Sequence, residues 1–427
     1  MNGPFASGAR LLLAVALLCS ACAPASGDGD HSAAPAQVAA NVSSHQHGNT
    51  ASARQVRLLL EQLLGHHAIL MVRLMRGPVD GERAFVSAAD GALRQNTGEL
   101  VDAVSSVYGA PAGAEFDTMW SEHVDLLADY GLARAQDDDG GMAAAREALD
   151  GYAARYGEMV SALTEGELPA DAVAEGVSAH IHHLLDATDA YAAGDYGAAF
   201  DDERTAYAGM FTTGKQLSGA AVSESTGELP AGFDSPPSEL RSALGRLLGE
   251  HVELAFDATR AVVSGNDAAA AAADALNANT QDIIAALQGA LGDDVAREFS
   301  RIWSEHIDAL VDFSVAVADD DAEAQARARA GLDAFPGALG EVLPALSRGR
   351  VTARSVIAAL KEHDEQLLQQ VTAYAAGDYE TSHDLAYSGY EHMFAIANTL
   401  ADALEGNASA TSPREGPATG GGGLSGR

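Results

Sequence analysis

The chain has 427 residues, and its 61 acidic and 25 basic side chains give a formal net charge of −36. Because so acidic a surface repels phosphate backbones, we expect no nucleic-acid partner. Hydrophobic residues make up 47% of the sequence, which is enough to form cores and excludes wholesale disorder. The only two cysteines lie near the N-terminus, so a disulfide framework and a cysteine zinc site are also excluded.

The first residues have the pattern of a bacterial export signal. Arg10 precedes the apolar run Leu11–Leu18, which is too short to span a membrane as a permanent helix. The residues up to Cys22 resemble a lipobox, in which Cys22 would carry the lipid, although Cys19 occupies a position usually held by leucine. We therefore expect an extracytoplasmic protein held at the cell membrane by a lipid anchor on Cys22. Cleavage by the ordinary signal peptidase, followed by secretion, is the alternative.

The remainder of the chain contains an internal duplication. Met119–His123 recurs as Ile302–His306, and Ala190–Tyr196 recurs unchanged as Ala373–Tyr379, both at an offset of 183 residues. Segments that repeat at one offset indicate tandem modules with the same fold. The predicted organisation is a signal peptide with a lipobox-like end at 1–22, a flexible tether at 23–54, a first module at 55–220, a linker at 221–237, a second module at 238–405 and a disordered tail at 406–427.

Each module has the hydrophobic periodicity of α-helices. Apolar residues recur three and four positions apart, and no segment alternates convincingly with the period of two that a strand requires. Gly77 and Pro78 are expected to end the first helix, and Gly194 and Asp195 are expected to cap a tight turn between the last two. The predicted fold is all-α, two tandem duplicated up-down helical bundles of about six helices each. In the first module the helices are predicted at 55–76, 82–107, 113–135, 141–164, 170–193 and 197–219.

Six histidines lie on the apolar faces of these helices. They form two equivalent trios, His67, His123 and His180 in the first module and His251, His306 and His363 in the second. Each of the first three lies about ten to twelve residues, roughly 15–18 Å, into its helix. The helices that carry them run parallel in an up-down bundle, so equal depth places the three imidazoles in one layer.

A layer of three imidazoles can hold a transition metal ion. Met210 is a possible fourth ligand in the first module, and His392 or Met393 in the second. Imidazole with thioether and no inward carboxylate suits copper, and three imidazoles with an open position suit zinc or copper. We therefore expect one buried metal site per module, copper first and zinc second, for sequestration or delivery at the cell envelope. We identify no acid–base residues for catalysis, so binding is favoured over an enzymatic role.

The alternative is a structural role for the same histidines. A histidine on an apolar face is usually hydrogen-bonded to a neighbour in the core, and Asn96, Asn279, Tyr207 and Tyr390 could provide such partners. The protein would then be a non-catalytic interaction or scaffold lipoprotein with a protein partner of unknown identity. The two interpretations differ in geometry, because the ligands of one metal converge whereas hydrogen-bonded rings separate.

The recurrent Glu-His pairs on the helices, the Gly-Asp-Tyr turn and the lipobox-like start also carry a resemblance. Together they resemble the secreted tandem helical-bundle lipoproteins of Gram-positive bacteria. The resemblance implies the bundle fold and the export destination, and it implies no particular activity.

Overall fold

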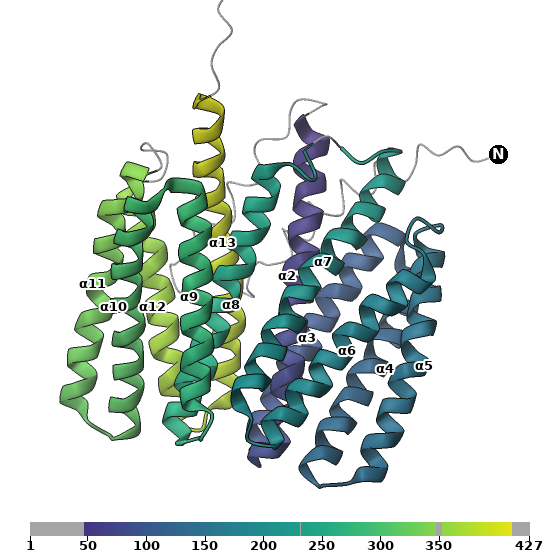
Figure 1. Cartoon of the computed structure of the whole chain (residues 1–427), viewed down its shortest axis with the longest axis horizontal. Helices are drawn as coiled ribbons and strands as arrows, with labels where there is room; N and C mark the ends of the chain where they lie inside the picture. The colour runs from purple at the N-terminus through teal and green to yellow at the C-terminus, as the bar shows by residue number, and fades with distance from the viewer. Residues whose placement is uncertain (1–46, 231, 347–351, 412–427) are drawn as a thin grey trace, which may run out of the picture.

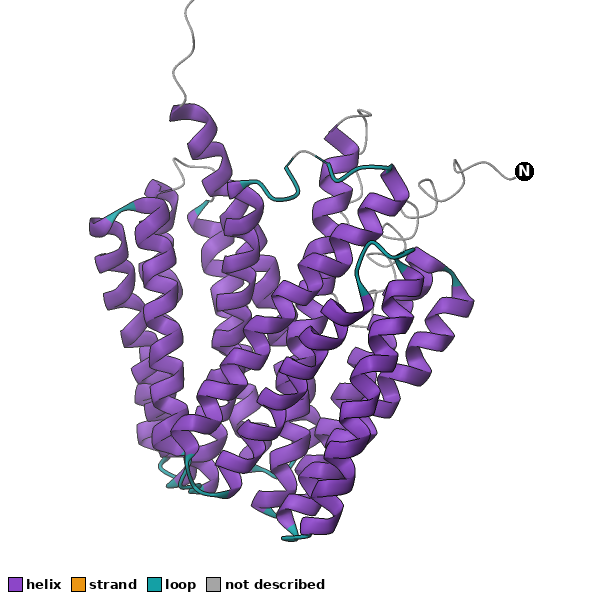
Figure 2. Cartoon of the chain, turned by 45° about the vertical axis from the view of Figure 1, so that its right-hand side comes forward, coloured by secondary structure: helices purple, strands orange, loops and turns teal. Residues whose placement is uncertain are grey.

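The computed structural model describes residues 47–230, 232–346 and 352–411, and these residues form helices and no strands. Figure 1 shows the helices gathered into two bundles that lie side by side, and Figure 2 shows the loops that join the helices. The predicted all-α fold with two helical bundles is confirmed. The first bundle consists of α2 (His47–Asp80), α3 (Arg83–Tyr108), α4 (Ala110–Ala135), α5 (Asp139–Leu163), α6 (Ala170–Ala192) and α7 (Tyr196–Thr226). The second consists of α8 (Pro236–Ser264), α9 (Ala269–Leu291), α10 (Asp293–Ala318), α11 (Ala322–Leu346), α12 (Ala353–Ala375) and α13 (Tyr379–Thr411).

One long helix lies at the centre of each bundle. α2 packs against α3, α4, α6 and α7, and α8 packs against α9, α10, α12 and α13. A helix surrounded in this way has apolar residues on nearly every face. Among the described helices, α2 alone is long and apolar enough to cross a membrane by length and composition, over Ala53–Asp80, and 78% of its most apolar window is buried inside the protein. In this structure α2 is therefore the core helix of the first bundle.

The turn between the last two helices of each bundle forms as the sequence predicts. Gly194 has a φ of 78°, in the left-handed region that favours glycine, and the side chain of Asp195 accepts a hydrogen bond from the Ala198 backbone N–H. The duplicated turn repeats this geometry, since Gly377 has a φ of 76° and Asp378 caps α13. Each turn reverses the chain within a few residues, so the two helices pack antiparallel.

α2 begins at His47, inside the segment predicted to be a tether. The first turns of this helix are held by a small apolar cluster in which Ala53 and Val56 pack with Val222 and Phe233. Burial of these side chains stabilises the helix beyond the start that periodicity alone indicates. The last helices of the two bundles are likewise longer than predicted, so the described linker between the bundles is correspondingly shorter.

The prediction that Gly77 and Pro78 end α2 is wrong, because the helix continues to Asp80. The carboxylate of Asp80 accepts hydrogen bonds from Tyr191 and Asn266 and forms an ion pair with Arg260. These contacts hold the last turn in place after the proline. The predicted signal peptide at 1–22, with Cys22, and most of the predicted tether and tail lie outside the described residues.

The two bundles pack against each other with pseudo-two-fold symmetry. Positions in α2 correspond to positions 184 residues later in α8, and positions from α3 onward correspond at 183. α2 contacts α8, while α3 contacts α13 and the equivalent helices α9 and α7 also contact each other. Side chains follow the same relation: Tyr387 donates to Glu99, and Arg204 pairs with Asp282 at the equivalent positions. The interface is therefore of the isologous kind found in symmetric dimers.

Buried charges at the middle of this interface break the symmetry. Arg73 on α2 pairs with Asp257, which is its own equivalent on α8, and with Glu253. Arg76 pairs with Asp257 and with Glu203. All five side chains are at most 2% exposed. Removing one member of such a network leaves an unpaired buried charge, which costs about 3–5 kcal/mol, so the network ties each bundle to the other.

Candidate metal centres

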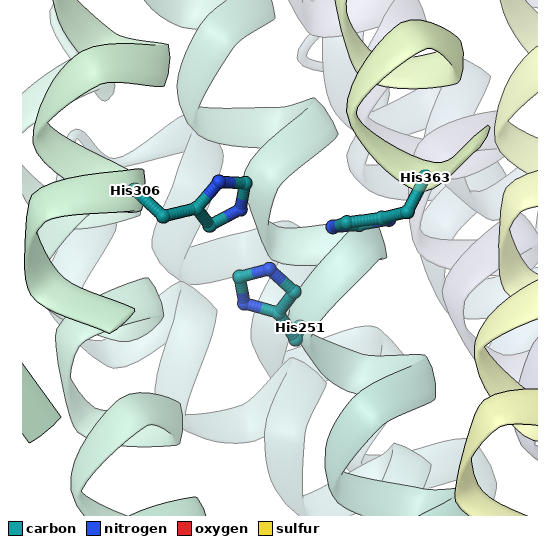
Figure 3. Close-up of side chains that lie close together, drawn as sticks. All are labelled: His251, His306 and His363. Carbon is teal, nitrogen blue, oxygen red and sulfur yellow. The ribbon is translucent and has the colours of Figure 1, made fainter. Parts of the chain in front are cut away.

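The three histidines of the second bundle point toward one another from three helices, as Figure 3 shows. His251 lies on α8, His306 on α10 and His363 on α12. One ring nitrogen from each residue lies within 4.8 Å of those of the other two, and all three side chains are at most 1% exposed. The structure therefore brings this predicted trio together, and the group could hold a metal ion.

Within the described part of the chain, the six ring nitrogens of this trio find no hydrogen-bond partner. Such groups are rare in folded proteins, since an unsatisfied buried polar group costs about 1–3 kcal/mol. Burial, and then the presence of a neighbouring histidine, lowers the pKa of each imidazole well below its ordinary value. The three rings are therefore neutral at pH 7, which is the protonation state that ligates a metal.

Aromatic and acidic side chains enclose the second trio. The rings of His251 and Trp303 lie 4.6 Å apart between centroids, and His306 stacks on Phe335 at 4.1 Å. The Nδ1 atom of His306 also lies 3.4 Å from Oδ1 of Asp364, although neither atom forms a hydrogen bond. Burial, with a smaller contribution from another carboxylate nearby, raises the pKa of Asp364 to about 8. A carboxyl group beside the second nitrogen of a ligand histidine commonly orients that ring in metal sites.

The trio of the first bundle is less closely gathered. The Nε2 atoms of His67 and His123 lie 3.1 Å apart, but His180 does not bring a ring nitrogen close to both of them. Among the residues that the structure describes, only the second trio brings one nitrogen per residue within 4.8 Å of the other two. Burial lowers the pKa of His123 to about 3 and that of His180 to about 4. These rings are therefore also neutral at pH 7.

The two trios differ in the oxygen that faces one histidine. The hydroxyl of Tyr152 lies 3.4 Å from Nδ1 of His123, whereas its equivalent in the second bundle is Phe335, which has no hydroxyl. There the carboxyl of Asp364 takes this place, at the same distance from His306. In both bundles the Nδ1 side of the α4 or α10 histidine thus faces an oxygen, which leaves Nε2 as the nitrogen available to a metal.

The hydrogen-bond partners expected for a purely structural trio are engaged elsewhere. Asn96 and Asn279 each donate to a backbone carbonyl of the central helix in their own bundle. Tyr207 and Tyr390 donate to backbone carbonyls across the interface between the bundles. These four side chains, which could serve as partners in the structural interpretation, instead donate hydrogen bonds to carbonyls of α2 and α8.

The predicted fourth ligands lie in mainly apolar surroundings. Met210 and Met393 are both buried in the cores of their bundles. His392 and Met393 line an apolar cavity in the second bundle, and Nε2 of His392 donates to the carbonyl of Ala359 at 2.9 Å. To ligate a metal, His392 would have to use Nδ1 or give up this hydrogen bond.

Sequence reasoning missed the polar groups around the trios. Asp364 was detectable in principle, since it follows His363 directly and occupies a position where the first module has the apolar Ile181. His66 and His383 were also missed, and both are buried where the two bundles meet. They lie on the sides of their helices that face the other bundle, so the periodicity within one module gives no signal for them.

No protein-family model matches the chain, and comparisons with curated proteins and with solved structures find no match. The class that the fold and the site define is a tandem helical-bundle protein with buried histidine trios. A functional conclusion therefore rests on the chemistry of the site itself.

Proposed function

We propose that the protein binds transition metal ions, copper first and zinc second, in one buried histidine site per bundle. The single observation that carries this proposal is the set of six unpaired, buried ring nitrogens of His251, His306 and His363. Three metal–nitrogen bonds would satisfy one nitrogen of each ring, whereas a purely structural trio leaves every one of them without a partner.

The distances in the trio are compatible with metal binding after a small contraction. Three nitrogens that each lie about 2.0–2.1 Å from one metal are at most about 3.5 Å apart. The nitrogens of the second trio lie within 4.8 Å of one another, so metal binding requires the rings to move together by about 1 Å. In the first bundle one pair, His67 and His123, is already at 3.1 Å.

Ligand chemistry favours copper and then zinc. The candidate ligands are neutral imidazoles, which bind both metals, and the nearest carboxyl group faces a ring nitrogen rather than the centre of the trio. Met210 and Met393 would add a thioether, which selects copper. Zinc would keep its fourth position open for water. The scaffold interpretation remains the second candidate, since it needs the same buried layer and no metal.

The export pattern at the N-terminus supports a role at the cell envelope. Arg10, the apolar run Leu11–Leu18 and the lipobox-like residues before Cys22 together support translocation and lipid attachment. A metal-binding protein tethered there would sequester metal or pass it to another envelope component. No nucleic acid is expected at so acidic a surface.

Metal content per chain tests the proposal. The full chain is prepared with Cys19, Cys22, His31, His45 and His47 replaced by alanine, which removes the thiols and histidines near the N-terminus. It is loaded with Cu(I), Cu(II) or Zn(II) and desalted. Bound metal is then counted by elemental mass spectrometry. We expect two equivalents per chain, one equivalent in His123→Ala, and none when His306→Ala is added.

His383→Phe is the matched control, because it removes a buried histidine that lies outside both trios. It should retain two equivalents. Folding of each variant is checked by its helical circular dichroism. If no metal is retained under any loading by the folded protein, the metal-binding proposal is wrong, and the scaffold interpretation takes its place.

A further inference from the structure

An apolar cavity of about 210 Å³ lies inside the second bundle, between α8, α9, α10, α11, α12 and α13. Aliphatic and aromatic side chains and Met393 form nearly all of its lining, and its polar lining residues are Ser355, Thr399 and His392. One nitrogen of His392 is already hydrogen-bonded to a backbone carbonyl. The cavity therefore offers few partners for the two to four hydrogen bonds that an ordered water needs.

The cavity ends against the histidine trio. Three of its lining residues, Leu248, Trp303 and Leu360, each lie three positions before a trio histidine on the same helix. Residues three apart are neighbours on one helix face. The floor of the cavity is therefore the layer of side chains next to the trio.

The cavity is elongated along the helix axes. On α13 its lining extends from His392 to Leu404, which spans about 18 Å at 1.5 Å per residue. Its other end lies where α9 ends at Leu291 and α12 begins, at the upper end of the second bundle in Figure 1. A space that is long and apolar fits an extended hydrocarbon chain better than a compact ring.

At two of the positions that line the cavity, the first bundle carries a tyrosine in place of a leucine. Leu339 and Leu291 line the cavity in the second bundle, and the equivalent residues of the first bundle are Tyr156 and Tyr108. A tyrosine occupies more volume than a leucine at each of these places. An apolar cavity of about 150 Å³ in another protein already binds benzene, so the larger space left by the two leucines is sufficient for a ligand.

We propose that this cavity binds the alkyl chain of a single-chain amphiphile, with the end of the chain against Trp303 and the head group at the upper end of the second bundle. This site goes beyond metal binding and does not depend on it. A fatty acid, a long-chain alcohol and a cationic surfactant all present the same alkyl chain, and this chain is the part of the ligand that the cavity contacts. The head group is what tells these classes of ligand apart.

Trp303 provides a direct probe, because the chain has only two tryptophans. In a Trp120→Phe background, metal-free protein is titrated by calorimetry with three alkyl probes, decanol, decanoate and decyltrimethylammonium, and with benzene for comparison. We expect at least one of the three alkyl probes to bind at one site per chain. The head group of the probe that binds most tightly identifies the class of ligand. Decanol that carries a terminal bromine should quench Trp303 fluorescence, since the bromine reaches the floor. From hexanol to decanol the affinity should rise about fourfold per added CH₂, which corresponds to about 0.8 kcal/mol.

Substitutions that copy the first bundle provide the controls. Leu339→Tyr and Leu291→Tyr fill the cavity from two different helices, and each should weaken binding at least tenfold. Val315→Phe adds an aromatic ring at a side chain that is 44% exposed and should leave binding unchanged. Circular dichroism shows which variants are folded.

The proposal is overturned if no alkyl probe binds, if benzene binds and decanol does not, or if a folded variant with Leu339→Tyr or Leu291→Tyr binds as well as its parent. Because the titrations are metal-free, failure to bind metal leaves these outcomes unaffected.

Discussion

The hydroxyl groups of Tyr207 and Tyr390 lie 3.3 Å apart at the pseudo-two-fold axis, and the two residues occupy equivalent positions in the duplicated modules. Tyr207 donates to the carbonyl of Arg246 on α8, and Tyr390 donates to the carbonyl of Gln62 on α2. Arg246 and Gln62 are themselves equivalent. Each bundle thus inserts one tyrosine against the central helix of the other, and the symmetry extends to single hydrogen bonds.

Removing either hydroxyl should weaken the structure to the same extent. Tyr207→Phe and Tyr390→Phe each delete one hydrogen bond between the bundles, and each should lower the free energy of unfolding by about 1 kcal/mol. Because the two hydroxyls are in contact, the double variant should depart from additivity by at least about 0.5 kcal/mol. Urea unfolding at pH 7 measures all three. Strictly additive effects would show that the two tyrosines act independently.

The tyrosines reach the axis because glycine occupies the facing positions. A Cβ atom at Gly65 would lie 2.7 Å from Phe211 and 2.9 Å from the Tyr390 hydroxyl, and one at Gly249 would meet Tyr207 at 2.9 Å. We expect Gly65→Ala and Gly249→Ala each to destabilise the protein by about 1–3 kcal/mol through overpacking.

Gly91→Ala is the matched control for these two substitutions. A Cβ atom there has nothing within 4 Å, so the higher helix propensity of alanine should stabilise the protein by up to about 1 kcal/mol. Thermal unfolding of the three variants gives the comparison. Stabilisation by Gly65→Ala or Gly249→Ala would contradict the close packing at the axis.

The sequence predicts the fold and the trios because both depend on local periodicity. His67, His123 and His180 fall on apolar helix faces at equal depth, and the duplication repeats the pattern. The convergence of His251, His306 and His363 in the second bundle therefore follows from helix geometry. The surroundings do not follow in the same way. Whether a ring nitrogen finds a hydrogen-bond partner depends on side chains from other helices, such as Tyr152 and Asp364. It also depends on how each of these side chains is rotated about its own single bonds.

The interface between the bundles was not predictable from the pattern within one module. Arg73 and Asp257 are equivalent positions with opposite charges, and they pair only because α2 and α8 face each other across the axis. The near-complete burial of α2 and α8 has a sequence signal, since both are apolar on most faces. The sequence gives no such signal for the partner of each buried charge, because that partner is set by how the surfaces of the two bundles pack together.

His383 should make the stability of the interface depend on pH. Burial, and then the positive charge of Arg73, lowers its pKa to about 4, while Glu253 opposes this effect and Arg260 adds to it. The unfolded chain has an ordinary histidine pKa near 6.5 and binds the proton first as pH falls. The contribution of this residue is therefore fully present above pH 6.5 and is lost as the pH falls toward 4, by about 2 kcal/mol between pH 6.5 and 5.

His383→Phe tests this dependence, because phenylalanine is the equivalent residue, Phe200, in the first module. The loss of unfolding free energy between pH 7 and pH 5 should be about 2 kcal/mol smaller in the variant than in the parent. The same substitution at the exposed His182 is the control. An unchanged pH dependence in His383→Phe would mean that His383 is not held neutral in the folded protein.

Asp364 should act on the metal site proposed for the second bundle by positioning His306. Its Oδ1 atom lies 3.4 Å from Nδ1 of that histidine, on the side away from the nitrogen available to a metal. Outer groups of this kind orient the ligand ring, and their loss costs about 10- to 100-fold in metal affinity. We expect Asp364→Asn, in a His123→Ala background that retains only the second site, to weaken Zn(II) binding by this factor. The measurement is a competition titration against a chromogenic chelator.

Asp312→Asn is the control for Asp364→Asn, because it makes the same chemical substitution at an exposed position on α10. It should leave Zn(II) affinity within about threefold of the parent, since an exposed charge acts weakly through solvent. In the opposite background, His306→Ala, the Asp364→Asn change should have no effect on the first site, where Tyr152 occupies the place beside the histidine. Equal weakening by both aspartate variants would assign the effect to net charge, and the positioning role of Asp364 would then be wrong.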